Sequence, residues 1–595
     1  MKDVKLTPEQ ECFAGHGAEA FVEACPGAGK TRTIVARLAS IAKTLPSRRA
    51  VAILSFTNSA VEKFAEDCEE AGLGVFLRFP HFAGTFDAFV RHFIVLPPGI
   101  ATSAFRPVIV DSWDSLGIDV RLAGSKAFAG DGLSLDKFDA ETGEVEPARI
   151  GHLALQSHVI KYQGDYQQAA ARIRDALHRK HGLLSAADAR IEARRHLQDV
   201  NWSNALGKAI AARFHEVIVD EAQDCNPLDL DILSWLRSHD LRVTVVCDPD
   251  QAIYGFRHGS PNGLLEFANK YQAANRLGLT GNFRSSKPIC ALAATLRNRR
   301  VPDSALGKMA DITHPVIVAA YAGRITGKIG QLFIERLESA IVGLSRKDGI
   351  VLAHKHDDAQ RATGDPMLSK ISGVSQIEAI ARMVGEFWSP SATTRSRDSA
   401  LRTMEKLLLI LLGHWKQDAD HHPSRVIERA KLNRRELRRQ ALEVLMNLPK
   451  TCDDTDQKRI DWVEAVRSEV NRMQLVLPQG QTVAGFFRRP PNGKWSQHLH
   501  APIVTNLACS TIHEAKGREY EAVCVVLKPD RAPLNRTSEL FDAWNNGTEL
   551  EAKRVIYVGI TRARRVVLIA VPKTFVDRCI AILNSGKVPH ECVQL

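Results

Sequence analysis

Two adjacent carboxylates, Asp220 and Glu221, follow a short apolar run in the segment VIVDEAQDCNPLD. Neighbouring carboxylates repel each other, and removing either from water costs free energy unless a cation lies nearby. A Mg²⁺ ion bound to nucleotide phosphates is one such cation. Asp220 would then lie on the metal side, and Glu221 would activate the attacking water molecule. The alternative for this segment alone is an acidic helix N-terminus stabilised by the helix dipole.

A Gly-rich turn near the N-terminus could supply the phosphate site. The segment AFVEACPGAGKTRTIVARLASIA has the spacing of a P-loop, with Ala24 in place of the usual first Gly. Gly27 and Gly29 allow backbone N–H groups to converge on phosphate oxygens, and the following helix N-terminus adds partial positive charge. Lys30 would reach the outer phosphates, and the Thr31 hydroxyl would bind Mg²⁺. The cofactor-binding residues predicted in this turn are Pro26, Gly27, Ala28, Gly29, Lys30, Thr31 and Arg32.

The elements that must position these groups are strands that end in polar residues. VIVD, AVCVVLK and VVLIAV are typical of sheet strands in any α/β protein, so the polar residues at their ends carry the information about chemistry. An amphipathic helix is expected to begin near Lys30, directly after the Gly-rich turn. The sequence therefore predicts an α/β fold with a nucleotide site at the strand ends.

Composition and charge narrow the class of partner. The chain has 595 residues, 45% of them hydrophobic and 25% charged, so several globular domains are expected. The net charge of +11 favours a polyanion, nucleic acid before membrane, although many basic proteins bind no nucleic acid. The N-terminus lacks a secretory pattern and no apolar run reaches the ~18–20 residues that span a bilayer, so a cytoplasmic location is expected. The run KLLLILLGHW is predicted to be a buried helix.

Metal-binding patterns are weak. The eleven cysteines are scattered without a CxxC pair, which indicates reduced thiols rather than a zinc or iron–sulfur site. His421 and His422 lie beside Asp418 and Asp420 and could bind a metal ion, but a polar loop explains them equally well.

With GAGKT and DEAQD both present, the chain resembles the UvrD/PcrA/Rep family of superfamily-one DNA helicases. Further segments match the family's motifs in order: LTPEQ, ILSFTNSAVEKF, AGTFDAFVRHFI, VCDPDQAIYGFRHG, LTGNFRSSKPI, STIHEAKGREYEAVCVV and RVIYVGITRARRVV. The resemblance also implies roles at the nucleotide. Gln10 would recognise adenine, Phe283 would stack on the adenine ring, and Glu519 would contact the ribose. Gln251 would sense the γ-phosphate, Arg284 would contact it, and Arg562 would act as a second arginine finger.

The DNA contacts implied by the resemblance lie in the motifs between the nucleotide groups. Aromatic side chains can stack on bases without sequence preference, at about 1–3 kcal/mol per base. The alternative is that these aromatics are core residues. Asp87 stands where the family usually has His, which leaves that DNA contact open. The predicted DNA-binding residues are Phe56, Thr57, Asn58, Tyr254, Phe256, Arg257 and His513, with Phe256 where the family often has Trp.

The resemblance implies two RecA-like P-loop NTPase core domains, each with parallel sheets flanked by helices and a mostly helical insertion domain. The first core is expected at 1–97 and 207–281, with its insertion at 98–206. The second core is expected at 282–374 and 500–595, with a short insertion at 375–499. Residues 425–440 contain seven Lys/Arg and two acidic residues. This stretch is predicted to be either a solvated helix face or a face that binds duplex DNA or a partner.

The function implied is an ATP-dependent single-stranded DNA translocase or helicase that moves 3′→5′ with Mg²⁺ and ATP. The alternative is an ATPase that responds to DNA ends and regulates a partner nuclease, with little unwinding. That alternative resembles the helicase-like subunit of Gabija-type anti-phage systems, whose partner is an OLD-type nuclease. DNA repair and anti-phage defence both stay open as pathways, and RNA stays open as the track.

Overall fold

The computed structural model describes most of the chain. The residues outside the description are 1–5, 103–106, 111–112, 115, 129–131, 146, 148–149, 151–152, 254–260, 298–301, 340–341, 365–374, 389–393, 416–425, 428–429, 453–454, 492, 501–506 and 531–536. The chain divides into two compact units. The larger unit comprises Met1–Pro107, Ala189–Gly364 and Leu507–Leu595, and the smaller comprises Val108–Asp188 and Asp365–Asn506.

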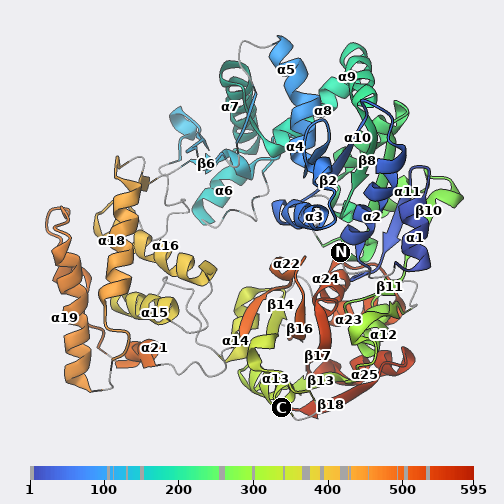
Figure 1. Cartoon of the computed structure of the whole chain (residues 1–595). Helices are drawn as coiled ribbons and strands as arrows, with labels where there is room; N and C mark the ends of the chain where they lie inside the picture. Colours follow the sequence, from blue (N-terminus) through green and yellow to red (C-terminus); the bar gives the residue numbers. More distant parts are fainter. Residues whose placement is uncertain are drawn as a thin grey trace. The chain divides into compact units, whose positions relative to one another are not determined.

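The first sheet of the larger unit has six parallel strands, and its colours in Figure 1 run from blue to green because the chain returns to it after an insertion. Their carboxyl ends therefore share one edge. In spatial order the strands are β10 (Arg276–Leu279), β1 (Phe21–Ala24), β9 (Arg242–Cys247), β8 (Phe214–Val219), β2 (Ala50–Ser55) and β3 (Phe82–Thr85).

Helices cover both faces of this first sheet. Buried residues of α1 (Pro8–Gly15), α2 (Lys30–Thr44) and α3 (Asn58–Glu70) share one core with β1 and β2. Two helices, α9 (Val200–Arg213) and α10 (Pro227–Ser238), contact β8 and β9. The remaining elements before residue 270 in this unit are α4 (Phe86–Val90), a π-helical turn (Arg91–Val95), α5 (Leu96–Thr102), α8 (Ala186–Gln198) and α11 (Pro261–Ala268).

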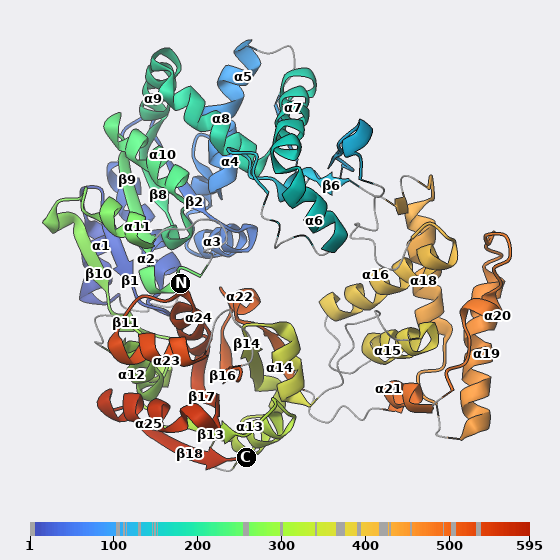
Figure 2. The same ribbon diagram turned by 180° about the vertical axis from the view of Figure 1, so that it is seen from behind.

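The second sheet also has six parallel strands. In spatial order they are β15 (Ala508–Thr511), β14 (Gly349–Ala353), β16 (Tyr520–Val526), β17 (Ala563–Pro572), β13 (Val316–Tyr321) and β18 (His590–Gln594). Helices lie on both sides of this sheet, as Figure 2 shows, and each side has its own buried core. One core contains residues of α12 (Lys287–Thr295), α23 (Thr537–Asn546), α24 (Glu551–Ile560) and α25 (Val576–Ser585), and the other contains residues of α13 (Lys328–Leu337) and α14 (His356–Thr363). Two short strands, β11 (Gly281–Asn282) and β12 (Ser304–Ala305), pair beside them.

This architecture confirms the predicted fold class of parallel-sheet cores flanked by helices. The strand before the Gly-rich turn ends at Ala24 and the helix after it begins at Lys30, as predicted. Residues 98–107 and 189–206, predicted to be part of the first insertion, fall within the larger unit.

The smaller unit has two separate hydrophobic cores. One gathers around Trp113 and Tyr166, and the other around Leu407 and Trp462. The first part comprises β4 (Val108–Val110), β5 (Asp119–Val120), β6 (Leu133–Ser134), α6 (Leu153–Lys161), α7 (Gln163–His181) and β7 (Leu183–Ser185). The second comprises α15 (Gln376–Trp388), α16 (Thr394–Leu411), α18 (Arg434–Asn447), α19 (Asp456–Arg472), α20 (Val483–Phe486) and α21 (Gln497–His500). Leu407, Leu408, Leu409 and Leu411 of the apolar run are buried within α16, as predicted.

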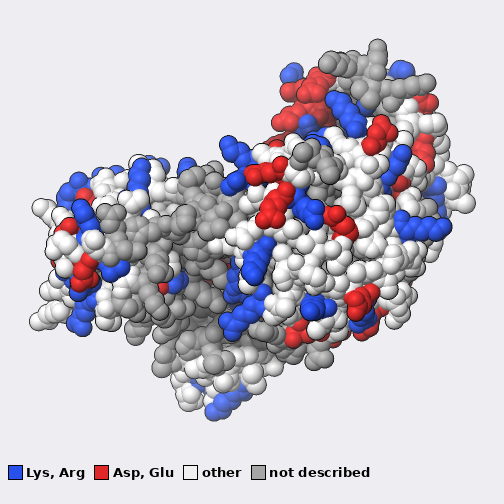
Figure 3. Space-filling model, turned by 90° about the horizontal axis from the view of Figure 1, so that it is seen from below, with Lys and Arg blue, Asp and Glu red and all other residues white. Residues whose placement is uncertain are grey.

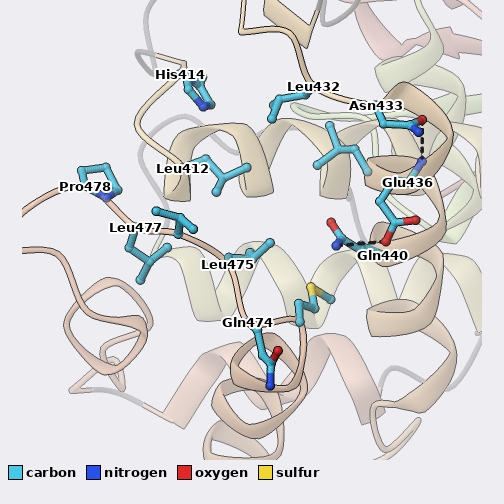
Figure 4. A pocket seen from close by; sticks show the side chains of 13 residues that line it. Leu412, His414, Leu432, Asn433, Glu436, Gln440, Gln474, Leu475, Leu477 and Pro478 are labelled. Carbon is cyan, nitrogen blue, oxygen red and sulfur yellow. Dashed lines mark hydrogen bonds between the residues drawn. The ribbon is translucent and has the colours of Figure 1, made fainter.

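A largely apolar cavity of about 580 Å³ lies in the second part of the smaller unit (Figure 4). Two of the hydrogen bonds in its wall involve Glu436: the Gln440 side chain donates to the Glu436 carboxylate at 3.3 Å, and the Asn433 side chain accepts from the Glu436 backbone N–H. The apolar lining residues are Leu412, Leu432, Leu437, Met473, Leu475, Val476, Leu477 and Pro478. None of the site residues predicted from the sequence lines this cavity. Across the described residues, no helix is both long and apolar enough to span a membrane.

Candidate nucleotide and nucleic-acid site

The Gly-rich turn joins β1 to α2 at the carboxyl edge of the first sheet. Gly27 and Gly29 have φ values of 73° and 71°, which residues with a side chain adopt only under strain. Gly29 precedes α2 without a side-chain cap, so the first N–H groups of that helix remain available to an anion. A Cβ atom on Gly27 would lie 2.5 Å from the Arg284 Cβ. The turn is therefore a phosphate cradle packed closely against the Arg284 segment.

The acidic pair lies at the same edge, directly after β8. The Lys30 ammonium is 3.0 Å from the Glu221 carboxylate. Lys30 is therefore the cation that lies beside the two acids in this structure. Burial opposes the Lys30 charge, but attraction from Glu221 and Asp220 outweighs it and raises the pKa of Lys30. Glu221 has a φ of 56°, an uncommon conformation for a residue with a long side chain.

The two neighbouring carboxyl groups titrate in opposite directions. Burial and the charge of Glu221 raise the pKa of Asp220. Burial also disfavours the Glu221 charge, but Lys30, Lys516 and a hydrogen bond from Gln223 together lower its pKa. Glu221 is thus the ionised partner, which is the state that a general base requires.

The donor atoms available for a divalent cation fit Mg²⁺. Asp220 forms no ion pair with any described residue, and only one hydrogen bond to it is resolved, from the Glu221 N–H to Oδ1 at 2.9 Å. A carboxylate and the Thr31 hydroxyl are hard oxygen donors of the kind Mg²⁺ prefers. The described residues contain no group of three His, Cys, Asp or Glu that could hold a metal ion alone. The fit is therefore to a cation held mainly by phosphates and water.

Arg562 reaches this site from the second sheet. Its guanidinium is 2% exposed, and Nη2 donates to the Gln251 side-chain oxygen at 2.9 Å. Burial and the nearby Arg284 charge lower the pKa of Arg562 to about 9. No described carboxylate forms an ion pair with it. A buried guanidinium without a carboxylate is unfavourable unless an anion joins it.

Arg284 is also brought to the cradle, but its guanidinium has protein partners. Nε donates to the Glu519 carboxylate at 2.8 Å, and Nη1 donates to the Thr561 carbonyl at 3.1 Å. The Glu519 side chain is 53% exposed, so its pairing with Arg284 is open to solvent. Glu519, predicted to contact a ribose, therefore also holds the predicted γ-phosphate arginine.

Gln10, on α1, forms a hydrogen bond with the phosphate cradle. Its amide nitrogen donates to the Ala28 carbonyl at 2.8 Å, and its amide oxygen accepts from the Thr7 N–H at 3.0 Å. Both halves of the amide that would read adenine are thus bonded within the protein. Phe283 lies beside the cradle, where its N–H donates to the Gly27 carbonyl at 2.9 Å, and its ring is half-buried.

A chain of hydrogen bonds links Glu221 to Arg562 through Gln223, Asp248 and Gln251, and only Gln251 of these three was predicted from the sequence. The Gln223 amide donates to Glu221, and its oxygen accepts from the Asp248 N–H at 3.0 Å. The Gln251 amide donates to the Asp248 carboxylate at 2.7 Å and accepts from Arg562. All five residues lie in segments recognised as motifs. Polar residues next to strand ends were the signal that could have identified Gln223 and Asp248.

Lys516 forms a second set of polar contacts between the two lobes. Its ammonium lies 2.6 Å from the Asp224 carboxylate and donates to the Gln251 carbonyl at 3.2 Å. Lys516 belongs to the segment EAKG after β15, and Asp224 closes DEAQD after β8. The ion pair therefore couples the acidic motif of one sheet to the second sheet.

The predicted DNA residues that the structure describes lie at the ends of β2 and β15. Phe56 stacks on the buried ring of Phe86 at 5.5 Å, so one face of its ring has a protein partner. Thr57 and Asn58 are exposed at the start of α3, where the Thr57 hydroxyl accepts from the Ala60 N–H. His513 packs edge-on against His354 at 5.5 Å, and burial lowers its pKa. Tyr254, Phe256 and Arg257 lie outside the described residues.

Asp87 takes part in an ion-pair network. Its carboxylate lies 2.6 Å from Arg190, which is also 3.0 Å from the buried Asp229 carboxylate. Where the family usually has His, this chain thus has an acid neutralised by its own arginine.

The surface charges do not form one basic stripe in the described part of the face in Figure 3, where acidic and basic residues alternate. On α18, Arg438 and Arg439 pair with acids of the same unit. Arg434 and Arg435 are exposed and form no ion pair with described residues. Both interpretations of the basic stretch therefore stay open. His421 and His422, with Asp418 and Asp420, lie outside the described residues.

Fold and site together define a P-loop NTPase with two parallel-sheet lobes, in which arginines of the second lobe approach the phosphate cradle of the first. The UvrD/REP helicase N-terminal domain model matches residues 6–96 and 134–272, and the UvrD-like helicase C-terminal domain model matches residues 495–574. The chain belongs to this UvrD-like helicase family.

Several curated helicases are similar to parts of the chain. The ATP-dependent DNA helicase UvrD2 of Mycobacterium tuberculosis is 27% identical over 386 residues, which cover 60% of this chain and 48% of that protein. The ATP-dependent DNA helicase srs2 of Schizosaccharomyces pombe is 25% identical over 289 residues, 46% of this chain and 32% of srs2. A probable DNA helicase II homolog of Rickettsia conorii is 21% identical over 453 residues, 64% and 63% of the two chains. The chain spans about half the length of the UvrD2 proteins that it matches.

Proposed function

We propose that the chain is an ATP-dependent translocase or helicase that moves on single-stranded DNA, 3′→5′ as the resemblance implies. The observation that carries the proposal is the hydrogen-bonded path from Glu221 to Arg562, because it joins the two lobes across the phosphate cradle. A path of this kind allows occupancy of the cradle to change how the lobes pack. The names of the similar helicases agree with this activity.

In the proposed mechanism, each lobe supplies different groups to hydrolysis. Lys30 and the cradle N–H groups bind the phosphates, and the Glu221 carboxylate accepts the proton of the attacking water. Arg562 and Arg284 stabilise the negative charge that develops on the transferred phosphoryl group. Thr31 and Asp220 would hold Mg²⁺, which supplies charge neutralisation between the phosphates when it is bound. Arg284 must leave Glu519 to take part.

Movement requires that both lobes grip the strand. Phe56, Thr57 and Asn58 follow β2 on the first lobe, and His513 follows β15 on the second. We propose that these groups hold adjacent stretches of the strand, so that closure of the lobes on ATP moves one group relative to the other. In this proposal residues 98–206 and 375–499 act as insertions that shape the path of the DNA.

The test is the ATPase rate with and without single-stranded DNA, followed by strand release from a duplex with a 3′ tail. We expect DNA to stimulate hydrolysis, and strand release to require both ATP and the tail. Stimulated hydrolysis without strand release, on 3′-tailed and 5′-tailed duplexes alike, would favour the alternative of a DNA-responsive ATPase that controls a partner. Absence of any nucleotide hydrolysis would refute the proposal.

A further inference from the structure

We propose that Ser55 is a positioning residue of the nucleotide site, whose hydroxyl accepts a hydrogen bond from a water molecule bound to the divalent cation beside Asp220. The inference deepens the proposed function and rests on it, because it takes a nucleotide with a divalent cation as the ligand. Ser55 was not among the site residues predicted from the sequence.

The first observation is a buried hydroxyl without a partner. Ser55 is the last residue of β2 and is 6% exposed. Its Oγ atom forms no hydrogen bond with any described residue. Leaving a buried hydroxyl unbonded costs about 1–3 kcal/mol, and such groups are uncommon in folded proteins. A hydroxyl of this kind is expected to gain a partner when the site is loaded.

The second observation is the register of the sheet. β2 pairs with β8 in parallel, with Leu54 opposite Val219, and the Asp220 N–H donates to the Leu54 carbonyl at 2.9 Å. The next pair in this register is Ser55 and Asp220. Residues opposite each other on parallel strands extend their side chains to the same face of the sheet. Ser55 and Asp220 are therefore neighbours on one face.

The face in question is the one that carries the phosphate cradle. Ile53 and Ile218, two residues before Ser55 and Asp220, belong to the core that also contains the buried residues of α2. Side chains two apart on a strand share a face, so Ser55 and Asp220 lie on the side of α2. Because α2 begins at Lys30, the hydroxyl and the carboxylate both lie at the edge where the cradle receives phosphates.

The chemistry of the neighbouring groups selects a cation-bound water as the partner. Water molecules on a divalent cation are hydrogen-bond donors, and a hydroxyl oxygen accepts such bonds as a carboxylate does. Groups that orient the ligands of a metal ion change its affinity about 10–100-fold when they are removed. Ser55 is thus placed to orient the water shell together with Asp220.

Ser55 also lies directly between the proposed cation site and the segment predicted to bind DNA. Phe56, Thr57 and Asn58 follow Ser55 directly, so any shift of the end of β2 on DNA binding moves the hydroxyl beside Asp220. No residue intervenes between the two sites along the chain.

The experiment compares Ser55→Val with Ser55→Thr in the full chain, because these variants have the same shape and differ by one hydroxyl. The affinity of mant-AMPPNP, a hydrolysis-resistant ATP analogue, is measured in EDTA and across a Mg²⁺ titration, with Ser55→Ala as a third variant. We expect all proteins to bind equally in EDTA. The Mg²⁺-dependent gain in affinity should fall about tenfold in Ser55→Val and Ser55→Ala, and should persist in Ser55→Thr. Melting temperatures in EDTA should not fall in Ser55→Ala, because the hydroxyl lost has no partner.

Three outcomes would overturn the inference. The first is a Mg²⁺-dependent gain in Ser55→Val within twofold of that in Ser55→Thr. The second is an equal loss of affinity with and without Mg²⁺, which would make Ser55 a packing residue. The third is a wild-type protein that binds no analogue or gains nothing from Mg²⁺, and only this result removes the proposed function as well.

Discussion

Replacing Arg562 with Met should stabilise the nucleotide-free protein while abolishing its turnover. The pKa of Arg562 is lowered from the ordinary value of an arginine to about 9, mainly by burial. A difference of this size corresponds to roughly 5 kcal/mol of penalty on the charged side chain. Because the folded pKa lies below the unfolded one, the penalty is present in full below about pH 9 and disappears as the pH rises toward the ordinary pKa of arginine.

The stability gained by replacing Arg562 is smaller than that penalty, because the guanidinium also donates hydrogen bonds that the variant loses. It donates to the Val558 carbonyl at 3.0 Å, the Gln251 oxygen at 2.9 Å, the Thr561 hydroxyl at 3.2 Å and the Arg518 carbonyl at 3.5 Å. Each of these four hydrogen bonds contributes about 1 kcal/mol to stability. We therefore expect Arg562→Met to raise the free energy of unfolding by about 1 kcal/mol, seen as a melting temperature that does not fall. Turnover should fall by about 10³-fold or more, since an arginine at the transferred phosphoryl group contributes on that order.

Arg37→Met provides the matched control. Arg37 is as deeply buried as Arg562, at 1% exposed, but Nε donates to Glu216 at 2.9 Å and the remaining nitrogens donate to backbone carbonyls. Removing one partner of a buried ion pair typically costs about 3–5 kcal/mol, so this variant should melt at a lower temperature. If Arg562→Met also melts lower, Arg562 is a structural arginine and the reasoning above is wrong. Turnover within about tenfold of wild type would contradict its role in hydrolysis.

The other predictions concern the cradle and the DNA side. Lys30→Ala should abolish hydrolysis, measured as phosphate release, and retained turnover would remove the phosphate-cradle assignment. Glu221→Gln should keep ATP and DNA binding but stop turnover, because it removes the base and keeps the shape; lost nucleotide binding would instead make Glu221 structural. Asp87→Asn should tighten single-stranded DNA binding by a few-fold in fluorescence anisotropy, because it removes a negative charge and one of the two carboxylates that pair with Arg190. A half-exposed pair contributes little stability, so a large drop in melting temperature without a change in affinity would show that Asp87 is structural.

Local sequence signals predicted the groups of the first lobe well. The apolar run, the two glycines and Lys30 specify a strand, a turn and a helix within about twenty residues, so the boundaries at Ala24 and Lys30 followed from the chain alone. The acidic pair after VIVD was likewise predictable as the end of a buried strand. In both cases the interactions that set the structure are local or repeat along one strand.

Partners distant in the sequence could not be predicted in the same way. The Arg284–Glu519 ion pair and the Arg562–Gln251 hydrogen bond require the two sheets to be placed relative to each other, and no periodicity encodes that placement. Gln10 illustrates the same limit, since the resemblance implied adenine recognition for it while the hydrogen bonds of both halves of its amide to the protein could not be predicted. The charge of a side chain is readable from the sequence, but its partner is not.

The path between the lobes consists of neutral amides at the points where it must rearrange. Gln223 and Gln251 each accept at one end and donate at the other, so they link Glu221, the buried Asp248 and Arg562 without adding a charge of their own. A carboxylate or lysine at either position would have to be desolvated and paired in every state of the site, at a cost of several kcal/mol. An amide exchanges one neutral partner for another at a cost of about 1 kcal/mol. A site that must open and close at each turnover therefore favours glutamine as the link between its fixed charges.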